Sequence, residues 1–122
     1  MHLDAVRTHC LALPEATEDL PFGPDPLVFK VGGKMFALLG LDDIPSRVVL
    51  KCDPERTVEL RDRYAGISTG PHFRNLHWNY VTLDGSVPSD LIRSLIDDSY
   101  RLVVAKLKKA DRERLLAALQ AT

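Results

Sequence analysis

The fold is decided by residues 27–41, which read Leu-Val-Phe-Lys-Val-Gly-Gly-Lys-Met-Phe-Ala-Leu-Leu-Gly-Leu. Two apolar runs flank Gly32-Gly33, a pair that accepts the positive φ angles of a tight hairpin turn. The second run is hydrophobic at every position from 35 to 39, which is typical of a central strand covered on its faces. We therefore expect a β-hairpin inside a sheet, with helices packed on at least one side.

Patterns on both sides of the hairpin predict further strands and helices. Apolar residues recur every three or four positions in the expected helices and alternate with polar residues in the expected strands. Three prolines between residues 20 and 26 allow at most a short edge strand there. The predicted helices cover residues 4–13, 53–64, 88–106 and 110–121, and the predicted strands cover residues 47–51 and 76–83.

The helix that starts near residue 88 is the best candidate to cover the sheet. Its apolar stripe includes Leu91, Leu95 and Ile96 and continues to Leu107. At about 1.5 Å per residue this helix would be about 30 Å long, enough to cross a small sheet. We expect this stripe and Trp78 to lie in the core.

The composition fits one domain over residues 1–122, because domains of roughly 100 to 150 residues are the commonest. No run approaches the roughly 20 apolar residues of a membrane span, and the first residues do not resemble a signal peptide. Cys10 and Cys52 lack the number and spacing of a disulfide framework or a zinc site. We expect a cytoplasmic protein with two buried free thiols and no membrane partner.

The densest polar and aromatic stretch is residues 71–80, which read Pro-His-Phe-Arg-Asn-Leu-His-Trp-Asn-Tyr. Nucleic-acid surfaces use such mixtures because cations hold phosphates, rings stack on bases and amides bond base edges. The other interpretation is that Trp78 and Tyr80 are core residues and the polar groups satisfy a loop. The net charge is -1, so a nucleic-acid binder must concentrate its positive charge locally.

The sequence contains no strong catalytic or metal-binding motif. A Gly-x-Ser-x-Gly turn, a phosphate-cradling loop and zinc-ligand spacing are all absent. His72 and His77 are five residues apart, so a regular strand would point them in opposite directions. The basic residues between 101 and 114 fit either phosphate contacts or a solvated helix face. We expect no metal, no cofactor and no enzymatic activity.

Several short motifs occur in order along the chain. They are Pro-Phe-Gly at 21–23, Val-Phe-Lys-Val-Gly-Gly-Lys-Met-Phe-Ala at 28–37, Leu-Lys-Cys-Asp-Pro at 50–54, His-Trp-Asn at 77–79 and Ser-Tyr-x-x-Val-Val-x-Lys-Leu at 99–107. Together they resemble the motifs of the MmcQ/YjbR family. The resemblance runs from about Leu13 to Leu107. It implies a bacterial protein with a CyaY-like α+β fold, in which helices flank an antiparallel sheet in a double-wing arrangement.

The resemblance also implies DNA binding, because the family is described as binding DNA through two hairpin wings. The first wing would span residues 28–36 and the second residues 72–80, with a further strand between them. The implied nucleic-acid-binding residues are Lys30, Lys34, Arg47, Lys51, His72, Arg74, Asn75, His77 and Asn79.

Iron binding is a rival that the similarity to CyaY raises. In CyaY-like iron binders acidic residues crowd the first helix and the sheet edge, but Asp4 is the only acid in the first helix here, so the resemblance does not imply iron binding. We therefore expect a monomeric DNA-binding protein that makes mostly non-specific phosphate contacts. Two alternatives remain open. One is a small-ligand-binding protein or enzyme with a pocket near His77 and Trp78, and the other is a protein-protein adaptor that uses the sheet or helix surface.

Overall fold

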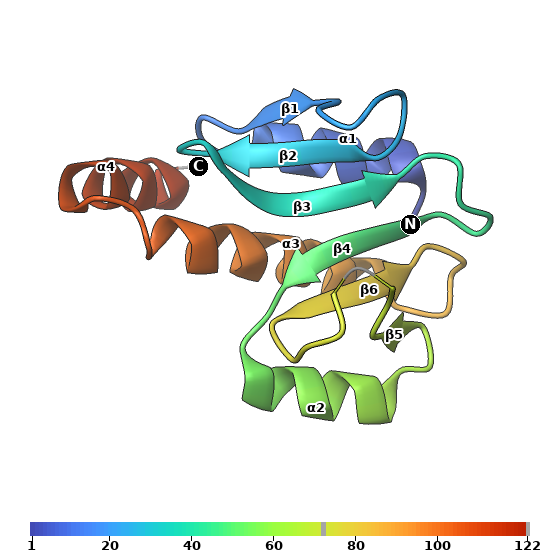
Figure 1. Cartoon of the computed structure of the whole chain (residues 1–122). Helices are drawn as coiled ribbons and strands as arrows, with labels where there is room; N and C mark the ends of the chain where they lie inside the picture. Colours follow the sequence, from blue (N-terminus) through green and yellow to red (C-terminus); the bar gives the residue numbers. More distant parts are fainter. Residues whose placement is uncertain (72, 122) are drawn as a thin grey trace.

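The computed structural model describes residues 1–71 and 73–121, and these form one antiparallel sheet with four helices (Figure 1). The strand order is β1-β2-β3-β4-β6-β5. The strands are β1 (Thr17–Asp19), β2 (Leu27–Val31), β3 (Lys34–Gly40), β4 (Arg47–Lys51), β5 (Ile67–Ser68) and β6 (Trp78–Thr82). The helices are α1 (Leu3–Ala12), α2 (Pro54–Arg63), α3 (Ser89–Val104) and α4 (Lys109–Gln120). The predicted α+β fold with an antiparallel sheet and flanking helices is confirmed.

The predicted hairpin is the pair β2 and β3, and its turn has the expected backbone. Gly32 and Gly33 have φ angles of 58° and 77°. Regular alternation would place Phe36 and Ala37 on opposite faces, but the register shifts between Phe29 and Lys30 and makes a bulge. Phe36 and Ala37 are consequently both buried in the core, and the Phe36 ring packs 6.4 Å from the Phe29 ring.

Ser99 of α3 supports the sheet where the bulge lies. Its hydroxyl donates to the carbonyl of Phe36 at 2.5 Å and accepts from the backbone N–H of Lys51 at 2.8 Å. Because Ser99 is fully buried, water does not reach its hydroxyl. Its two hydrogen bonds therefore supply the partner that the Phe36 carbonyl and the Lys51 N–H would otherwise lack. This one side chain therefore fixes the start of β3 and the end of β4 relative to α3.

Helices α1 and α3 cover one face of the sheet and form the core with it (Figure 1). The apolar stripe of α3 is confirmed, since Ile92, Leu95 and Ile96 are all buried. The ring of Tyr100 packs edge-on against Phe36 at 5.4 Å, and its hydroxyl donates to the carbonyl of Pro14. None of the described helices is long and apolar enough to cross a lipid bilayer.

Two expectations about individual elements are wrong, and one strand was not predicted. Trp78 is only half-buried and lies outside the core, on the sheet face opposite α1 and α3. The strand that was not predicted is the edge strand β1, in the acidic segment before the prolines, and residues 20–26 form no strand, as their three prolines allow. Helix α3 ends at Val104, although its apolar stripe continues to Leu107.

Candidate functional site

Two loops lie over the sheet face opposite α1 and α3, which we call the open face. They are residues 20–26, before β2, and residues 69–77, between β5 and β6. On this face Val28, Val49 and Tyr80 are 2%, 1% and 5% exposed, yet they do not belong to the main core cluster. The loops therefore bury a second, smaller set of apolar side chains.

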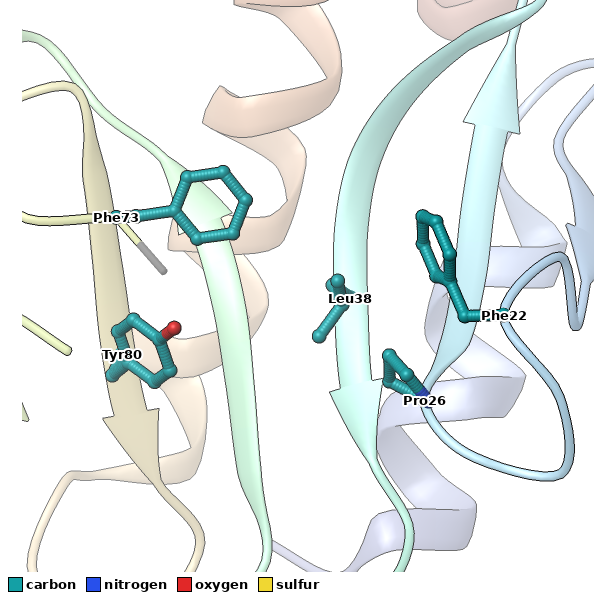
Figure 2. Close-up of a pocket in the computed structure, with 5 residues that line it drawn as sticks. All are labelled: Phe22, Pro26, Leu38, Phe73 and Tyr80. Atoms are coloured by element: carbon teal, nitrogen blue, oxygen red, sulfur yellow. The ribbon is translucent and has the colours of Figure 1, made fainter. Parts of the chain in front are cut away.

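A pocket of about 370 Å³ lies between the two loops, and we call it the aromatic pocket (Figure 2). Phe22 and Pro26 form one side, Phe73 and Tyr80 form the other, and Leu38 lies between them. Phe22 is 73% exposed, so most of its ring is available to a ligand. The sequence placed a possible ligand pocket near His77 and Trp78, but neither of these residues lines the aromatic pocket.

Close packing holds Tyr80 in the wall of the aromatic pocket. A Cβ atom at Gly70 would come within 2.2 Å of the Tyr80 ring, so no side chain fits at position 70. The guanidinium of Arg47 lies over the same ring at 4.9 Å from its centre. Arg47 also pairs with Asp43 at 3.6 Å, which places this predicted phosphate-binding cation beside an acidic loop.

The loop of residues 69–77 is tied to α2 by Arg61. Its Nη2 atom donates to the carbonyls of Asn75 and Trp78 at 2.7 and 3.1 Å. Within the loop, the side-chain oxygen of Asn75 accepts from the backbone N–H groups of His77 and Trp78. Asn75 thus has a structural function, and Arg61 is an anchor that the sequence analysis missed because nothing in the helix pattern marks so distant a contact.

Asn79 was predicted to bind nucleic acid, but its side chain does not reach the surface. It is only 3% exposed, its side-chain oxygen accepts from Arg61 at 2.8 Å, and its side-chain nitrogen donates to Thr57 at 3.1 Å. Strand alternation explains the correction, because residue 79 points to the helix side of the sheet when Trp78 and Tyr80 point to the open face. Asn79 therefore stabilises the contact between β6 and α2.

Lysines gather at one end of the sheet, which we call the basic end. There β2 and β4 finish while β3 and β6 begin, and the register pairs Lys51 with Trp78. A hollow of about 260 Å³ at this end is lined by Lys34, Met35, Lys51, Trp78, Val103 and Lys106. Lys30 is beside it, opposite Met35 in the ladder.

The lysines of the basic end have no carboxylate partner among the described ion pairs. The other end of the sheet, at the right of Figure 1, carries acidic residues in or beside the strand ends and loops: Asp19, Asp25, Asp42, Asp43 and Asp84. The net charge of -1 therefore hides an uneven distribution of charge along the strands.

The remaining predicted residues lie in the loop that leads to the basic end. Arg74 and His77 are exposed, and the carbonyl of His77 accepts from the N–H of Cys52 at 2.7 Å, which holds the loop beside the end of β4. His72 lies outside the described residues. Lys106 was recognised only as part of the basic run at residues 101–114, because the chain pattern does not show that it reaches the same hollow as Lys34.

The described residues contain no group of three or more histidine, cysteine, aspartate or glutamate side chains placed to hold a metal ion. Both cysteines are buried free thiols. Burial raises the pKa of the Cys10 thiol to about 12, and the charge of Asp97 contributes in the same direction. Such a thiol is a poor nucleophile, because the thiolate is the reactive form.

Comparisons with known proteins show which family the chain resembles. The YjbR family model matches residues 11–102. YbdF from Escherichia coli O157:H7 is 39% identical over 116 residues, covering 94% of this chain and 93% of that protein. YjbR from Escherichia coli K12 is 29% identical over 116 residues, covering 95% and 98%. Both are described as uncharacterised proteins, so neither brings an activity to this chain.

Solved structures agree with this assignment. The crystal structure of a Deinococcus radiodurans protein with a DUF419 domain is similar with a TM-score of 0.86 and 43% sequence identity, covering 93% of this chain and 86% of that one. A Pseudomonas syringae protein solved by crystallography has a TM-score of 0.72 and 28% identity, covering 84% and 98%. From the family match over residues 11–102 and these relatives, the chain belongs to the YjbR family.

Proposed function

We propose that the protein binds DNA through the basic end of the sheet. The observation that carries this proposal is the hollow in which Lys34, Lys51 and Lys106 surround Trp78, without a carboxylate partner among the described ion pairs. Ammonium groups attract phosphates whatever the base sequence, and binding releases the counterions that surround DNA. Lys30 adds positive charge beside this hollow, and Arg74 adds it in the loop that leads there, where His77 is also exposed.

The contacts are mostly to phosphates, because the side-chain oxygens of the two asparagines predicted to contact bases already accept hydrogen bonds within the protein. Asn75 caps its own loop, and Asn79 is bonded to Arg61 and Thr57. The acidic end of the sheet further weakens long-range attraction to DNA. We therefore expect affinities in the range of roughly 10⁻⁴ to 10⁻⁶ M at physiological salt, which is typical of non-specific binding.

The test measures the affinity for a labelled 20-base-pair duplex by fluorescence anisotropy across a salt series. Each lost phosphate contact should reduce the slope of log affinity against log salt by about 0.9, so Lys34→Ala/Lys51→Ala should reduce it by about 1.8. The matched control is Arg63→Ala/Arg93→Ala, which removes the same charge from two exposed arginines of α2 and α3.

The control should keep the parent slope, since neither arginine lines the basic end. Equal slopes in the parent, the lysine variant and the control would contradict the proposal, provided that all three proteins unfold at similar denaturant concentrations. An equal loss in both variants would contradict it too, because that result would mean that overall charge alone sets the affinity.

A further inference from the structure

We infer that the aromatic pocket and Trp78 accept unpaired bases, so that the preferred ligand is single-stranded rather than duplex DNA. This inference rests on the proposed function, because it takes the basic end as the site that holds the phosphates. It adds a second part to that site, made of the aromatic side chains on the open face.

The aromatic side chains form a continuous row that starts at the basic end. The ring of Phe73 lies 5.3 Å from the ring of Trp78 and 6.4 Å from that of Tyr80, measured between ring centres. Trp78 lines the lysine hollow, whereas Phe73 and Tyr80 line the aromatic pocket. A strand whose phosphates contact Lys34 and Lys51 therefore has its bases beside a set of rings.

The shape and chemistry of the aromatic pocket suit a flat, uncharged ring. Its volume of about 370 Å³ lies between the exposed ring of Phe22 on one side and Phe73 and Tyr80 on the other (Figure 2). Proteins bind single strands by stacking successive bases on such rings next to a positive groove. Bases inside a duplex are already paired and stacked, so they cannot enter without unpairing.

The charges around the aromatic pocket determine which part of the nucleotide enters. Asp25 precedes the pocket residue Pro26, and Asp43 pairs with the arginine that covers Tyr80. The Asp43 carboxylate offsets the charge of Arg47, so the aromatic pocket has no excess positive charge to hold a phosphate, and the Asp25 carboxylate repels one. A neutral base is not repelled. The phosphates therefore remain on the basic end, and only bases reach the pocket. Because the five residues that line it are apolar apart from the Tyr80 hydroxyl, stacking should tolerate different bases.

The test uses the intrinsic fluorescence of Trp78, which is the only tryptophan of the chain. Three probes of equal length are titrated at one salt concentration: a thymidine oligonucleotide, the same strand paired in a duplex, and an abasic strand that keeps the phosphates without the bases. The thymidine strand should quench the tryptophan and bind at least about 10-fold more tightly than either of the other two probes.

Phe22→Ala tests the pocket separately from the phosphate contacts. The variant should fold, because Phe22 is 73% exposed. It should lower the affinity for the thymidine strand on the order of 5- to 100-fold, the usual effect of losing one stacking ring, and change the duplex affinity by less than about twofold. The matched control is Ile44→Ala, which removes a 99% exposed apolar side chain outside the aromatic pocket and should change neither affinity.

The outcomes separate the inference from the proposed function. Equal affinity for the thymidine, duplex and abasic probes would overturn the inference and leave DNA binding at the basic end intact, provided that the Lys34→Ala/Lys51→Ala effect persists. The absence of salt-dependent binding to every probe would overturn both. A thymidine preference that Phe22→Ala and Ile44→Ala reduce equally would also overturn the pocket model.

Discussion

Both faces of the sheet bury apolar side chains, but they are covered in different ways. On one face, helices α1 and α3 bury Val6, Ile96 and Tyr100 completely. On the open face, the loops of residues 20–26 and 69–77 bury Val28, Val49 and Tyr80 but leave the aromatic pocket between them. A helix presents a continuous row of side chains, whereas a loop buries only what its few side chains reach.

Because of this difference, the residues that stabilise the fold and the residues proposed to bind a ligand lie on different faces of the sheet. The helix-covered face contains the core cluster, and none of the five residues that line the aromatic pocket belongs to that cluster. Loops positioned by a rigid scaffold often carry binding residues. Here Arg61 of α2 holds the loop of residues 69–77 by hydrogen bonds, and Gly70 of that loop packs against Tyr80 of β6. Changes on the helix-covered face should mainly alter the free energy of unfolding, whereas changes on the open face should mainly alter binding.

The largest expected effect concerns the reactivity of Cys10, under the helix-covered face. With a pKa of about 12, this thiol is ionised in only about one molecule in 10⁴ at pH 8, whereas an unperturbed thiol is about one quarter ionised. Alkylation of Cys10 by iodoacetamide should therefore be on the order of 10³-fold slower in the native protein than in urea. Mass spectrometry of the Cys52→Ser variant follows this one thiol, and rapid native labelling would show that α1 does not seal the core.

The next effect compares one leucine from each face. Leu95→Ala, in the core, should lower the free energy of unfolding by about 2 to 5 kcal/mol, as deletions of buried leucine side chains do. Leu38→Ala should cost roughly half as much or less, because Leu38 is only partly buried and already lines a pocket. Urea unfolding measures both, and equal losses would mean that the loops pack on the open face as tightly as the helices pack on the other.

Sequence patterns predicted the helix-covered face well, because its signals are local. The Gly32-Gly33 turn and the apolar stripe of α3 lie within single stretches of chain. The start of α2 was also predicted from a local signal, an aspartate followed by a proline. In the structure the Asp53 carboxylate accepts from the N–H of Glu55 and Pro54 begins the helix. The bulge at Phe36 was not predicted. A bulge shows in a sequence as a break in the alternation of polar and apolar residues, and residues 35–39 are all hydrophobic, so they have no such alternation.

The open face was harder to predict, because its geometry depends on contacts between distant residues. The sequence marked residues 71–80 as a polar and aromatic stretch, and the family resemblance implied the lysines, but neither could show which amides were already bonded. Arg61 donates to the side-chain oxygen of Asn79 and to the backbone carbonyl of Asn75, which lie 18 and 14 residues away along the chain. The side-chain oxygen of Asn75 is instead bonded within its own loop. Phe22 was part of a family-like motif, yet only the fold places its ring opposite Phe73.

The smallest expected effect concerns the edge where the two faces meet. Arg7 of α1, on the helix-covered side, holds Glu18 of β1 through two hydrogen bonds, one of them at 2.7 Å, and β1 leads into the loop of residues 20–26. The hydrogen bond from Arg7, followed by its charge, lowers the pKa of the Glu18 carboxyl below its ordinary value of 4.5. Because both side chains remain in contact with water, the pair should contribute little to stability.

The direction of the pH dependence follows from that lowered pKa. The folded state binds the Glu18 proton more weakly than the unfolded state, so the contribution of the pair is fully present above the unfolded pKa and is lost as the pH falls through the lowered folded pKa. The difference in melting temperature between the parent and Glu18→Gln should therefore be small and constant from pH 7 to about pH 5.5 and should shrink below about pH 4.5. The control is Glu59→Gln, which removes an exposed carboxylate of α2 that is absent from the described ion pairs. If both variants gave the same pH profile, the pair of Arg7 and Glu18 would not stabilise the edge where the two faces meet.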